Sequence, residues 1–502
     1  MAIAIKKTAA IAIAAGLTFA GSAGIAAQDA LAQDPSAAVA ASTIDVNAKG
    51  SITLYKKADP EKTGTPTGEV DPNVQGDPLD GAGFTLYKVK NASLNTNADL
   101  VKAAGLTAKD AQIDVNDPIK PETKTANGGK IEWKDLPVGV YLVKETTPVE
   151  GYSPAADFLV FVPMTKANAQ AGGTDWMYDV VAYPKNYKQQ DPTKSVVDTG
   201  KNVNQDVVYT IDTWAQTIDA DRQQRTIYRI EDTLDPAAST TADNVKILGD
   251  KFAKGTDYTV AVNDVDGKKQ VVITFTKDGV EKITNGEKIS AEITAMVNKM
   301  PEGGILKNTA QQIENNPNTG QENEPKKTPE VETRYAGIQF KKVNSKGDAL
   351  KDAEFQVYGA VGDQKCEDAI KNKKALQSTE GKETFVSGQD GMVTINGLHV
   401  NDRANSDQNT PNKWTKYCLV ETKSPKGYEL LSQPIEFTLA WANSGTLQKI
   451  TVGDKEGEVV NLDDTTPFLP NTGGMGIAIL ILAGLGIIGG GAYVARRNSQ
   501  SA

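Results

Sequence analysis

The sequence is poor in the side chains that most catalytic and metal sites need. Its 502 residues include one histidine, His399, and two cysteines, Cys366 and Cys418. A zinc site needs several Cys, His or carboxylate ligands close together, and a Ser-His-Asp triad would have to use His399. This histidine stands in a Gly-, Asn- and Asp-rich stretch, so we expect it at the surface. The shortage argues against metalloenzymes and histidine-based hydrolases, and it predicts no metal and no cofactor.

The chain also lacks an excess of positive charge. Its 64 Asp and Glu residues outnumber its 54 Lys and Arg residues, which gives a net charge of −10. Proteins that bind nucleic acids concentrate basic residues on one face. The sequence therefore predicts no nucleic-acid partner.

The N-terminus has the order of a secretory signal peptide. Lys6 and Lys7 precede an apolar run over residues 8–20, and small residues then lead to Ala-Leu-Ala at 30–32. This pattern predicts export and cleavage after residue 32. A membrane anchor is the alternative, but the apolar run is short for a bilayer span.

The C-terminus carries a long apolar segment. Gly474–Val494 is twenty-one residues without a charge, and Arg496 and Arg497 follow it. At about 1.5 Å per residue, a helix of this length spans roughly the 30 Å of a bilayer core. Because positive residues flank the cytoplasmic end of a span, the sequence predicts a transmembrane helix with the preceding chain outside the cell.

A short motif stands directly before this segment. Leu469-Pro470-Asn471-Thr472-Gly473 resembles the LPxTG sorting signal of Gram-positive surface proteins, and the apolar span and arginine tail follow in the expected order. Residues 316–320 share the last four letters without the leucine or the span, and we interpret them as a loop. The resemblance implies that a sortase cysteine attacks the Thr472 carbonyl, releases Gly473 onward and holds an acyl-enzyme. The chain would then be a substrate rather than an enzyme.

The interior alternates apolar and polar residues over short segments, which clusters of Gly, Pro, Asn and Asp separate. This pattern is typical of antiparallel β-sandwiches. The length fits roughly three domains, and Pro-bearing stretches near 184–192 and 317–329 indicate connections between them. Short helices are expected near 99–104 and 366–374. The sequence therefore predicts an all-β protein.

Two segments of the interior recur later in the chain. Residues 141–152 match residues 417–428, and residues 79–87 match residues 350–358 in the same order. These segments resemble the collagen-adhesin B-type domain, and the Tyr-x-Leu-x-Glu-Thr stretch resembles the E-box of Gram-positive pilins. The domain between them lacks an E-box and resembles the A-type relative. The resemblance implies three tandem Ig-like β-sandwiches of B, A and B type.

In that family, a lysine on the first strand becomes amide-bonded to an asparagine on the last strand, beside a catalytic Glu or Asp. Alternation places Lys342 on the same face as Ile338 and Phe340, which directs it inward. Glu421 and Asn461 also fall on apolar faces. Burial lowers the pKa of a lysine and raises that of a glutamate, so the amine can attack the amide while Glu421 transfers protons. The alternative is a buried ion pair with a hydrogen-bonded asparagine.

The other two domains allow the same mapping. The spacing from glutamate to asparagine is 41 positions in the first domain and 40 in the third. In the middle domain an aspartate takes the place of the glutamate, and Lys201 or a different acid is the main alternative. The candidate triads are Lys56, Glu145 and Asn186 in the first domain, and Lys194, Asp232 and Asn308 in the middle domain.

Residues 176–186 resemble the WxxxVxVYPK pilin motif, with Ala182 where valine is usual. Alternation predicts that Lys185 projects outward while Asn186 points inward. The resemblance implies that the Lys185 amine of one subunit resolves the acyl-enzyme formed at Thr472 of another. A solvated surface lysine is the alternative, and Lys188 and Lys194 are the nearest other candidates for the linkage.

The two cysteines, Cys366 and Cys418, both fall in the third domain. In an exported domain we expect them to pair rather than remain free thiols. A disulfide between them closes a loop of about 52 residues, worth roughly 4 kcal/mol in the chain-entropy model.

Over nearly its whole length the chain resembles a Spa-type major pilin, the shaft subunit of a sortase-assembled pilus. The predicted organisation is a signal peptide (1–32), an N-terminal Ig-like domain with the pilin motif (33–186), a middle Ig-like domain (187–332), a C-terminal B-type domain (333–465) and a sorting signal (466–502).

The resemblance implies several partners. They are a pilin-specific sortase, identical subunits joined head to tail, tip and basal minor pilins, and peptidoglycan. The expected location is a wall-anchored pilus on the surface of a Gram-positive bacterium. No enzymatic activity is expected beyond autocatalytic formation of the internal amides. The alternative is a monomeric wall-anchored adhesin that binds host matrix, but this would leave the pilin motif unexplained.

Overall fold

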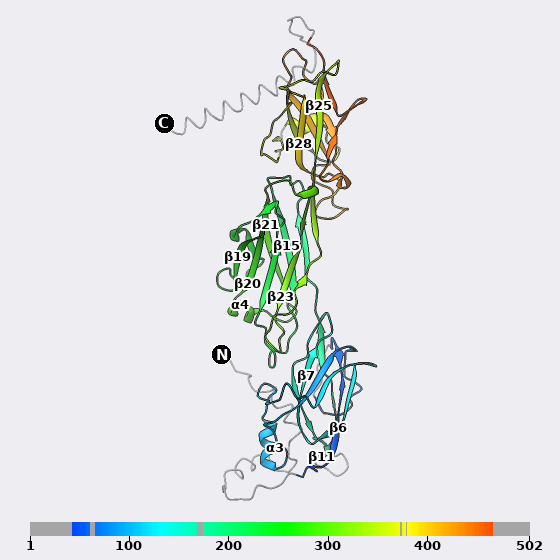
Figure 1. Ribbon diagram of the computed structural model, residues 1–502, viewed down its shortest axis with the longest axis vertical. Coiled ribbons are helices and arrows are strands. Elements are labelled where there is room, and N and C mark those ends of the chain that lie inside the picture. The colour runs from blue at the N-terminus through cyan, green and yellow to red at the C-terminus, as the bar shows by residue number, and fades with distance from the viewer. Residues whose placement is uncertain (1–42, 61–65, 168–173, 372–373, 378, 465–502) are drawn as a thin grey trace, which may run out of the picture.

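The computed structural model describes residues 43–60, 66–167, 174–371, 374–377 and 379–464. Their regular secondary structure is mostly β-strand, and it is arranged as three units along one long axis (Figure 1). The predicted all-β class is confirmed. No helix in these ranges is long and apolar enough to cross a bilayer. The predicted signal peptide, C-terminal helix and sorting motif lie outside the described residues.

The first unit contains four sheets and one helix. The two larger sheets have the strand orders β12-β1-β6 and β5-β4-β7-β9, and the smaller ones are β3-β2-β13-β8 and β10-β11. The elements are β1 (Lys49–Tyr55), β2 (Lys57–Ala58), β3 (Asp77–Pro78), β4 (Gly83–Lys88), α3 (Asn97–Ala104), β5 (Lys120–Lys124), β6 (Lys130–Pro137), β7 (Gly139–Thr147), β8 (Tyr152–Ser153), β9 (Phe158–Val162), β10 (Met164–Ala167), β11 (Thr174–Met177), β12 (Asp179–Ala182) and β13 (Lys185–Lys188).

The middle unit is a pair of five-stranded sheets. One has the order β14-β15-β21-β17 with β18 also on β21, and the other the order β19-β20-β16-β23-β24. The elements are β14 (Thr193–Val197), β15 (Asp206–Trp214), β16 (Tyr228–Thr233), β17 (Ala238–Ser239), η2 (Ala242–Asn244), β18 (Val245–Ile247), β19 (Tyr258–Val265), β20 (Lys268–Phe275), α4 (Lys277–Lys282), β21 (Lys288–Val297), η3 (Glu302–Gly304), β22 (Ile305–Asn308), β23 (Ala310–Glu314) and β24 (Lys326–Lys327).

The third unit is joined to the middle unit by one continuous strand, β25 (Val331–Asn344). The start of β25 pairs with β22, and its remainder pairs with β28, β31 and β34. The division that the sequence places after residue 332 therefore falls inside a strand. The other elements are β26 (Glu354–Ala360), α5 (Cys366–Lys371), β27 (Phe385–Val386), β28 (Met392–His399), β29 (Lys416–Lys423), β30 (Ile435–Phe437), η4 (Trp441–Asn443), β31 (Leu447–Lys449), β32 (Thr451–Val452), β33 (Lys455–Glu456) and β34 (Glu458–Asn461).

Alternation of apolar and polar residues explains how these strands build their cores. Along β15, burial alternates residue by residue, and Val207, Tyr209 and Ile211 enter the middle core. This is the pattern of a strand with one face on a core and the other toward solvent. The helices α3 and α5 occur where the sequence predicts short helices. A capping box formed by Thr96 and Asp99 begins α3, which buries Leu100 and Ala103.

The expected surface position of His399 is wrong. His399 ends β28 and is fully buried between the middle and third units. Its backbone N–H donates to Asn202 Oδ1 at 2.9 Å, and its Nε2 lies 3.4 Å from Asp198 Oδ2. The Thr333 hydroxyl donates to the same carboxylate oxygen at 2.6 Å. The residues around His399 have the composition of a loop, but composition does not reveal which other segments pack over a loop. Here a turn of the preceding unit packs over His399.

Candidate crosslinking sites

The third unit brings its three predicted residues together in the core. Lys342 on β25 lies with its Nζ 3.3 Å from Glu421 Oε1 and in contact with Asn461 Oδ1. Asn461 Nδ2 donates to Glu421 Oε1 at 2.9 Å, and the Leu431 backbone N–H donates to Glu421 Oε2 at 2.9 Å. All three members of the triad are buried. The amine, the carboxyl and the carboxamide therefore contact one another away from solvent.

Burial makes this lysine a better nucleophile. Desolvation lowers the pKa of Lys342 from 10.5 to about 8, although the charge of Glu421 opposes the shift. A substantial fraction of neutral amine is therefore present near physiological pH, next to the amide that it would attack.

The first unit repeats this arrangement. Lys56 Nζ donates to Glu145 Oε2 at 2.7 Å and contacts Asn186 Oδ1. Asn186 Nδ2 donates to Glu145 Oε1 at 2.7 Å, and the Ala155 backbone N–H donates to Glu145 Oε2 at 2.7 Å. Burial lowers the pKa of Lys56 to about 8, against the attraction of Glu145. The two glutamate sites thus share the same contacts, as the sequence repeat predicts.

The middle unit gathers the predicted Lys194, Asp232 and Asn308, but with looser geometry. Lys194 Nζ contacts Asp232 Oδ2, to which Asn308 Nδ2 donates at 3.4 Å. Among the described residues, Asp232 Oδ1 and Asn308 Oδ1 have no hydrogen-bond partner. Burial raises the pKa of Asp232 and lowers that of Lys194, in each case against the attraction of the partner's charge. Both shifts favour a neutral amine beside a neutral acid.

The strand register explains why these groups meet. In the third unit β25 and β34 run parallel, with Lys342 opposite Val459 and Asn344 opposite Asn461. In the first unit β2 and β13 are also parallel, with Ala58 opposite Asn186. In both units the lysine therefore lies on or directly beside a strand near the start of the unit's sequence, and the asparagine lies on a strand near its end. An amide between them would join those two strands covalently.

An aromatic ring faces the amine in each site, which sequence reasoning missed. The distance from Nζ to the ring centroid is 5.1 Å for Phe84, 4.7 Å for Tyr209 and 5.7 Å for Phe355. The sequence could have indicated two of these rings, because Phe84 and Phe355 occupy matching positions in the repeated segments 79–87 and 350–358. Nothing in the sequence marked Tyr209.

The pilin-motif lysine is less exposed than alternation predicts. Lys185 begins β13 and is half-buried, and its Nζ donates to the Tyr183 carbonyl oxygen at 3.2 Å. Its neighbour Asn186 is fully buried on the other face of the strand. Burial lowers the pKa of Lys185, and the positive charge of Arg222 from the middle unit adds to the effect. The lysine therefore lies at the junction between two units.

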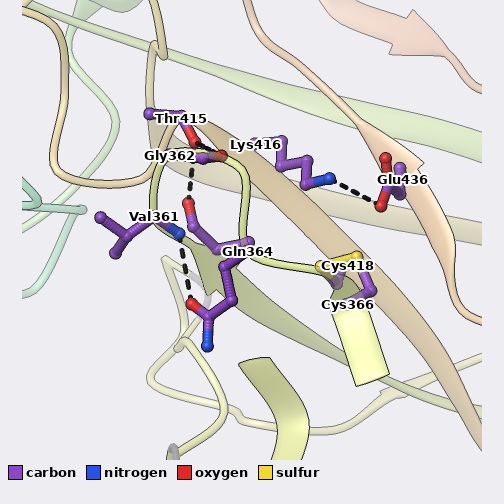
Figure 2. Close-up of a disulfide and its surroundings, with 9 residues drawn as sticks. Val361, Gly362, Gln364, Cys366, Thr415, Lys416, Cys418 and Glu436 are labelled. Atoms are coloured by element: carbon purple, nitrogen blue, oxygen red, sulfur yellow. Dashed lines mark hydrogen bonds and ion pairs between the residues drawn. A yellow bond between two sulfur atoms is a disulfide. The ribbon is translucent and has the colours of Figure 1, made fainter. Parts of the chain in front are cut away.

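The predicted disulfide is confirmed. Cys366 at the start of α5 is bonded to Cys418 on β29, with 5.6 Å between their Cα atoms (Figure 2). Figure 2 shows that the bond ties the helix to the strand beside the Lys416–Glu436 ion pair. The disulfide thus closes a loop inside the third unit.

Comparison with known proteins identifies the family of the chain. A model described as Gram-positive pilin subunit D1, N-terminal domain, matches residues 47–187, and a prealbumin-like fold domain matches residues 336–456. The fimbrial subunit type 2 of Actinomyces naeslundii is 30% identical over 493 residues, which cover 89% of this chain and 88% of that protein. The fimbrial subunit type 1 of Actinomyces viscosus is 30% identical over 546 residues, which cover 97% of each.

A solved structure agrees with these relatives. The full-length major pilin SpaD from Corynebacterium diphtheriae is 32% identical, with a TM-score of 0.65, and the match covers 84% of this chain and 99% of that chain. The chain therefore belongs to the family of Gram-positive fimbrial subunits. It is a structural subunit of a pilus.

Proposed function

We propose that this pilus subunit is a shaft subunit that sortase joins into a covalent polymer and that internal Lys–Asn amides stabilise. The observation that carries the internal chemistry is the triad seen in each unit, in which a buried lysine contacts a buried acid beside an asparagine. In the first and third units the amine also contacts the carboxamide oxygen of that asparagine.

The reaction follows from the contacts in the third unit. The neutral Lys342 amine attacks Cγ of Asn461, and a new C–N bond forms. Glu421 carries the proton from the lysine nitrogen to Nδ2, since it contacts both groups. The bond between Cγ and Nδ2 then breaks, and ammonia leaves. No cofactor or oxidant is needed, and Glu421 returns to its starting state.

Intact mass tests this chemistry directly, because each amide expels one ammonia. We expect the exported chain to be lighter than its sequence by one ammonia for each crosslink, after allowance for the disulfide. Asn461→Ala should lose the third-unit crosslink only. Asn443→Ala, which removes an asparagine outside the triads, is the matched control. A wild-type mass equal to the sequence mass would show that the triads are ordinary buried ion pairs.

Polymerisation would use groups outside the triads. A sortase would cleave between Thr472 and Gly473, and the Lys185 amine of an incoming subunit would take the acyl group. The lowered pKa of Lys185, which favours the neutral amine that the linkage needs, supports this role. Identical subunits would thereby join head to tail, with minor pilins at the tip and base and peptidoglycan as the final anchor. The chain itself would catalyse only its internal amides.

The polymer is tested by changing the amine alone. Lys185→Arg keeps the positive charge but cannot form the amide, so we expect high-mass ladders from wall extracts to disappear while folded monomer remains. Lys188→Arg, on the same strand, is the control and should retain the ladders. Ladders that persist in the Lys185 variant would assign the linkage to another lysine, and ladders absent from the wild type would favour a monomeric adhesin.

A further inference from the structure

The acid of the first unit is held by a backbone N–H whose peptide group a side chain of the middle unit contacts. Ala155 N–H donates to Glu145 Oε2 at 2.7 Å, the same oxygen that accepts from the Lys56 amine. This N–H belongs to the peptide group that joins Pro154 to Ala155. The carbonyl oxygen of that group accepts from Gln223 Nε2 at 3.0 Å, and Gln223 lies in the middle unit between β15 and β16. One planar peptide group therefore connects Gln223 to Glu145.

The Gln223 side chain is itself held in place. It is 3% exposed, and its Nε2 donates to Asn318 Oδ1 at 2.9 Å as well as to the Pro154 carbonyl. Its Oε1 accepts from the Asp219 backbone N–H at 2.8 Å. Both N–H groups and the oxygen of this buried amide are therefore used. Gln223 presents a fixed donor to the first unit.

The third unit has the matching N–H without the matching donor. Leu431 N–H donates to Glu421 Oε2 at 2.9 Å, as Ala155 N–H does to Glu145. Within the described part of the chain, the Leu430 carbonyl of the same peptide group receives no hydrogen bond from the middle unit. Support from a neighbouring unit is therefore a feature of the first site, and the third site serves as a reference for it.

We propose that Gln223 is a positioning residue for the first-unit crosslink, because it holds the peptide group whose N–H orients Glu145. The proposal rests on the proposed amide between Lys56 and Asn186. Hydrogen bonds in series polarise one another, so donation to the carbonyl of a peptide group strengthens the donation from its N–H. Docking of the middle unit would therefore promote crosslinking in the first unit.

Glu145 needs this orientation to transfer the proton. Its Oε2 accepts from the Lys56 amine and its Oε1 accepts from Asn186 Nδ2, each at 2.7 Å. The amine attacks Cγ of Asn186 and a C–N bond forms. Glu145 carries one proton from the lysine nitrogen to Nδ2, the bond between Cγ and Nδ2 breaks, and ammonia leaves. A carboxyl group that turns away from either partner transfers the proton less well. Gln223 supplies orientation only and exchanges no proton.

Gln223→Met tests the role because it removes the donor and keeps the length of the side chain. The full chain is made in a short pulse of cell-free synthesis and transferred to buffer. Mass spectrometry of proteolytic fragments then follows the fraction of molecules linked at Lys56 and Asn186. Loss of one hydrogen bond of ordinary strength corresponds to up to roughly tenfold in rate, and we expect a slowing of about that size. The crosslinks of the middle and third units in the same molecules should form at their normal rates.

Gln223→Glu separates the hydrogen bond from the packing. A protonated glutamate can donate to the Pro154 carbonyl, whereas an ionised one cannot. The first-unit rate is divided by the third-unit rate of the same molecules at each pH. For Gln223→Glu, this ratio should be low at neutral pH and should recover toward the wild-type value as the pH falls. For Gln223→Met it should stay low throughout, because methionine cannot gain a donor.

Gln189→Met is the matched control, since it removes another glutamine from the junction of the same two units. Gln189 Nε2 donates to the Ser153 hydroxyl at 3.2 Å and to Gln216 Oε1 at 3.4 Å. These contacts bridge the first and middle units, and neither involves the peptide group that joins Pro154 to Ala155. We expect this variant to form the first-unit crosslink at the wild-type rate.

Three results would overturn the proposal. An unchanged first-unit rate in Gln223→Met, in a chain whose wild type is linked at Lys56 and Asn186, would leave the glutamine as simple packing. Equal slowing in Gln189→Met, or no recovery of Gln223→Glu at low pH, would assign the effect to the docking of the two units as a whole. A wild-type chain that stays unlinked at Lys56 and Asn186, while the third unit is linked, would remove the proposed first-unit crosslink and this role together.

Discussion

Removal of one carboxyl group should convert the third unit from an inextensible body into an extensible one. With the Lys342–Asn461 amide in place, a force applied at the two ends of the unit passes through the crosslink and bypasses the 119 positions between its residues. Glu421→Ala leaves the lysine and the asparagine but removes the group that transfers protons between them. We expect this variant to stay unlinked and to unfold under load.

The disulfide divides the expected extension into two parts. The bond between Cys366 and Cys418 spans 52 of the 119 positions, which leaves 67 free to extend while it is intact. At a maximum of about 3.6 Å per residue, the variant should lengthen by about 240 Å in oxidising buffer and by about 430 Å after reduction. The wild type should show neither step, because reduction does not open the amide.

Single-molecule force spectroscopy on the exported chain measures these lengths. Glu436→Ala is the matched control, because it removes an exposed carboxylate from the neighbouring strand β30 and leaves the triad intact. The control should be as inextensible as the wild type. A wild-type third unit that extends by about 240 Å, or a Glu421 variant that does not, would refute the reasoning.

Three further predictions follow from particular contacts. His399→Ala should loosen the junction of the middle and third units, because it removes a fully buried side chain that packs against Tyr335 and leaves a cavity beside Asp198; limited proteolysis should then cut the junction faster than in the wild type. In the unlinked variant Asn461→Ala, the pKa of Lys342 is about 8 in the folded chain and 10.5 in the unfolded chain, so the unfolded chain binds more protons between these two values. Denaturant titrations should therefore show a free energy of unfolding that rises with pH across this window and not below it. Cys366→Ser in the same unlinked background should lower that free energy by up to roughly 4 kcal/mol, and reductant should give a matching loss in the parent but no further loss in the serine variant.

The resemblance to the collagen-adhesin domains named the kinds of residue to look for, and period-two alternation then selected the candidate triads. Lys342 shares a face with Ile338 and Phe340, and the structure buries all three. A strand fixes the direction of a side chain relative to its neighbours, so a lysine among inward-facing apolar residues must enter the core. Because the first unit repeats the plan of the third, the same reasoning predicted that Lys56 points into the core of the first unit.

Features that depend on neighbouring units could not be predicted in this way. His399 and Lys185 both lie at junctions, and a segment of the middle unit lies close to each one. Tyr209 was not predicted for a related reason. It lies on β15, and the position of β15 relative to β22 depends on how two sheets pack. Alternation along a strand predicts which side chains share a face. The residues that this face contacts depend on how sheets and units pack together.

The proposed bonds, taken together, form one covalent line through the subunit. Force would enter at Lys185, reach the middle-unit crosslink at Lys194 after nine positions, cross to Asn308, and continue along 34 positions to Lys342. The last part of that stretch, from Val331 onward, is β25, which is already extended and pairs with strands of the third unit from Tyr335 onward. From Asn461, eleven positions remain to Thr472.

This line assigns different tasks to the three triads. The middle and third crosslinks lie directly in the path of the force, so each must form for the shaft to resist extension. Residues before Lys185 lie outside that path. The Lys56–Asn186 crosslink would instead join Asn186, the neighbour of Lys185, to the residue directly after β1. This bond would hold strand β13 in position while force acts on Lys185. Loss of the Lys56–Asn186 bond should therefore weaken the seating of Lys185 without adding any length under force, a signature that distinguishes it from loss of either other bond.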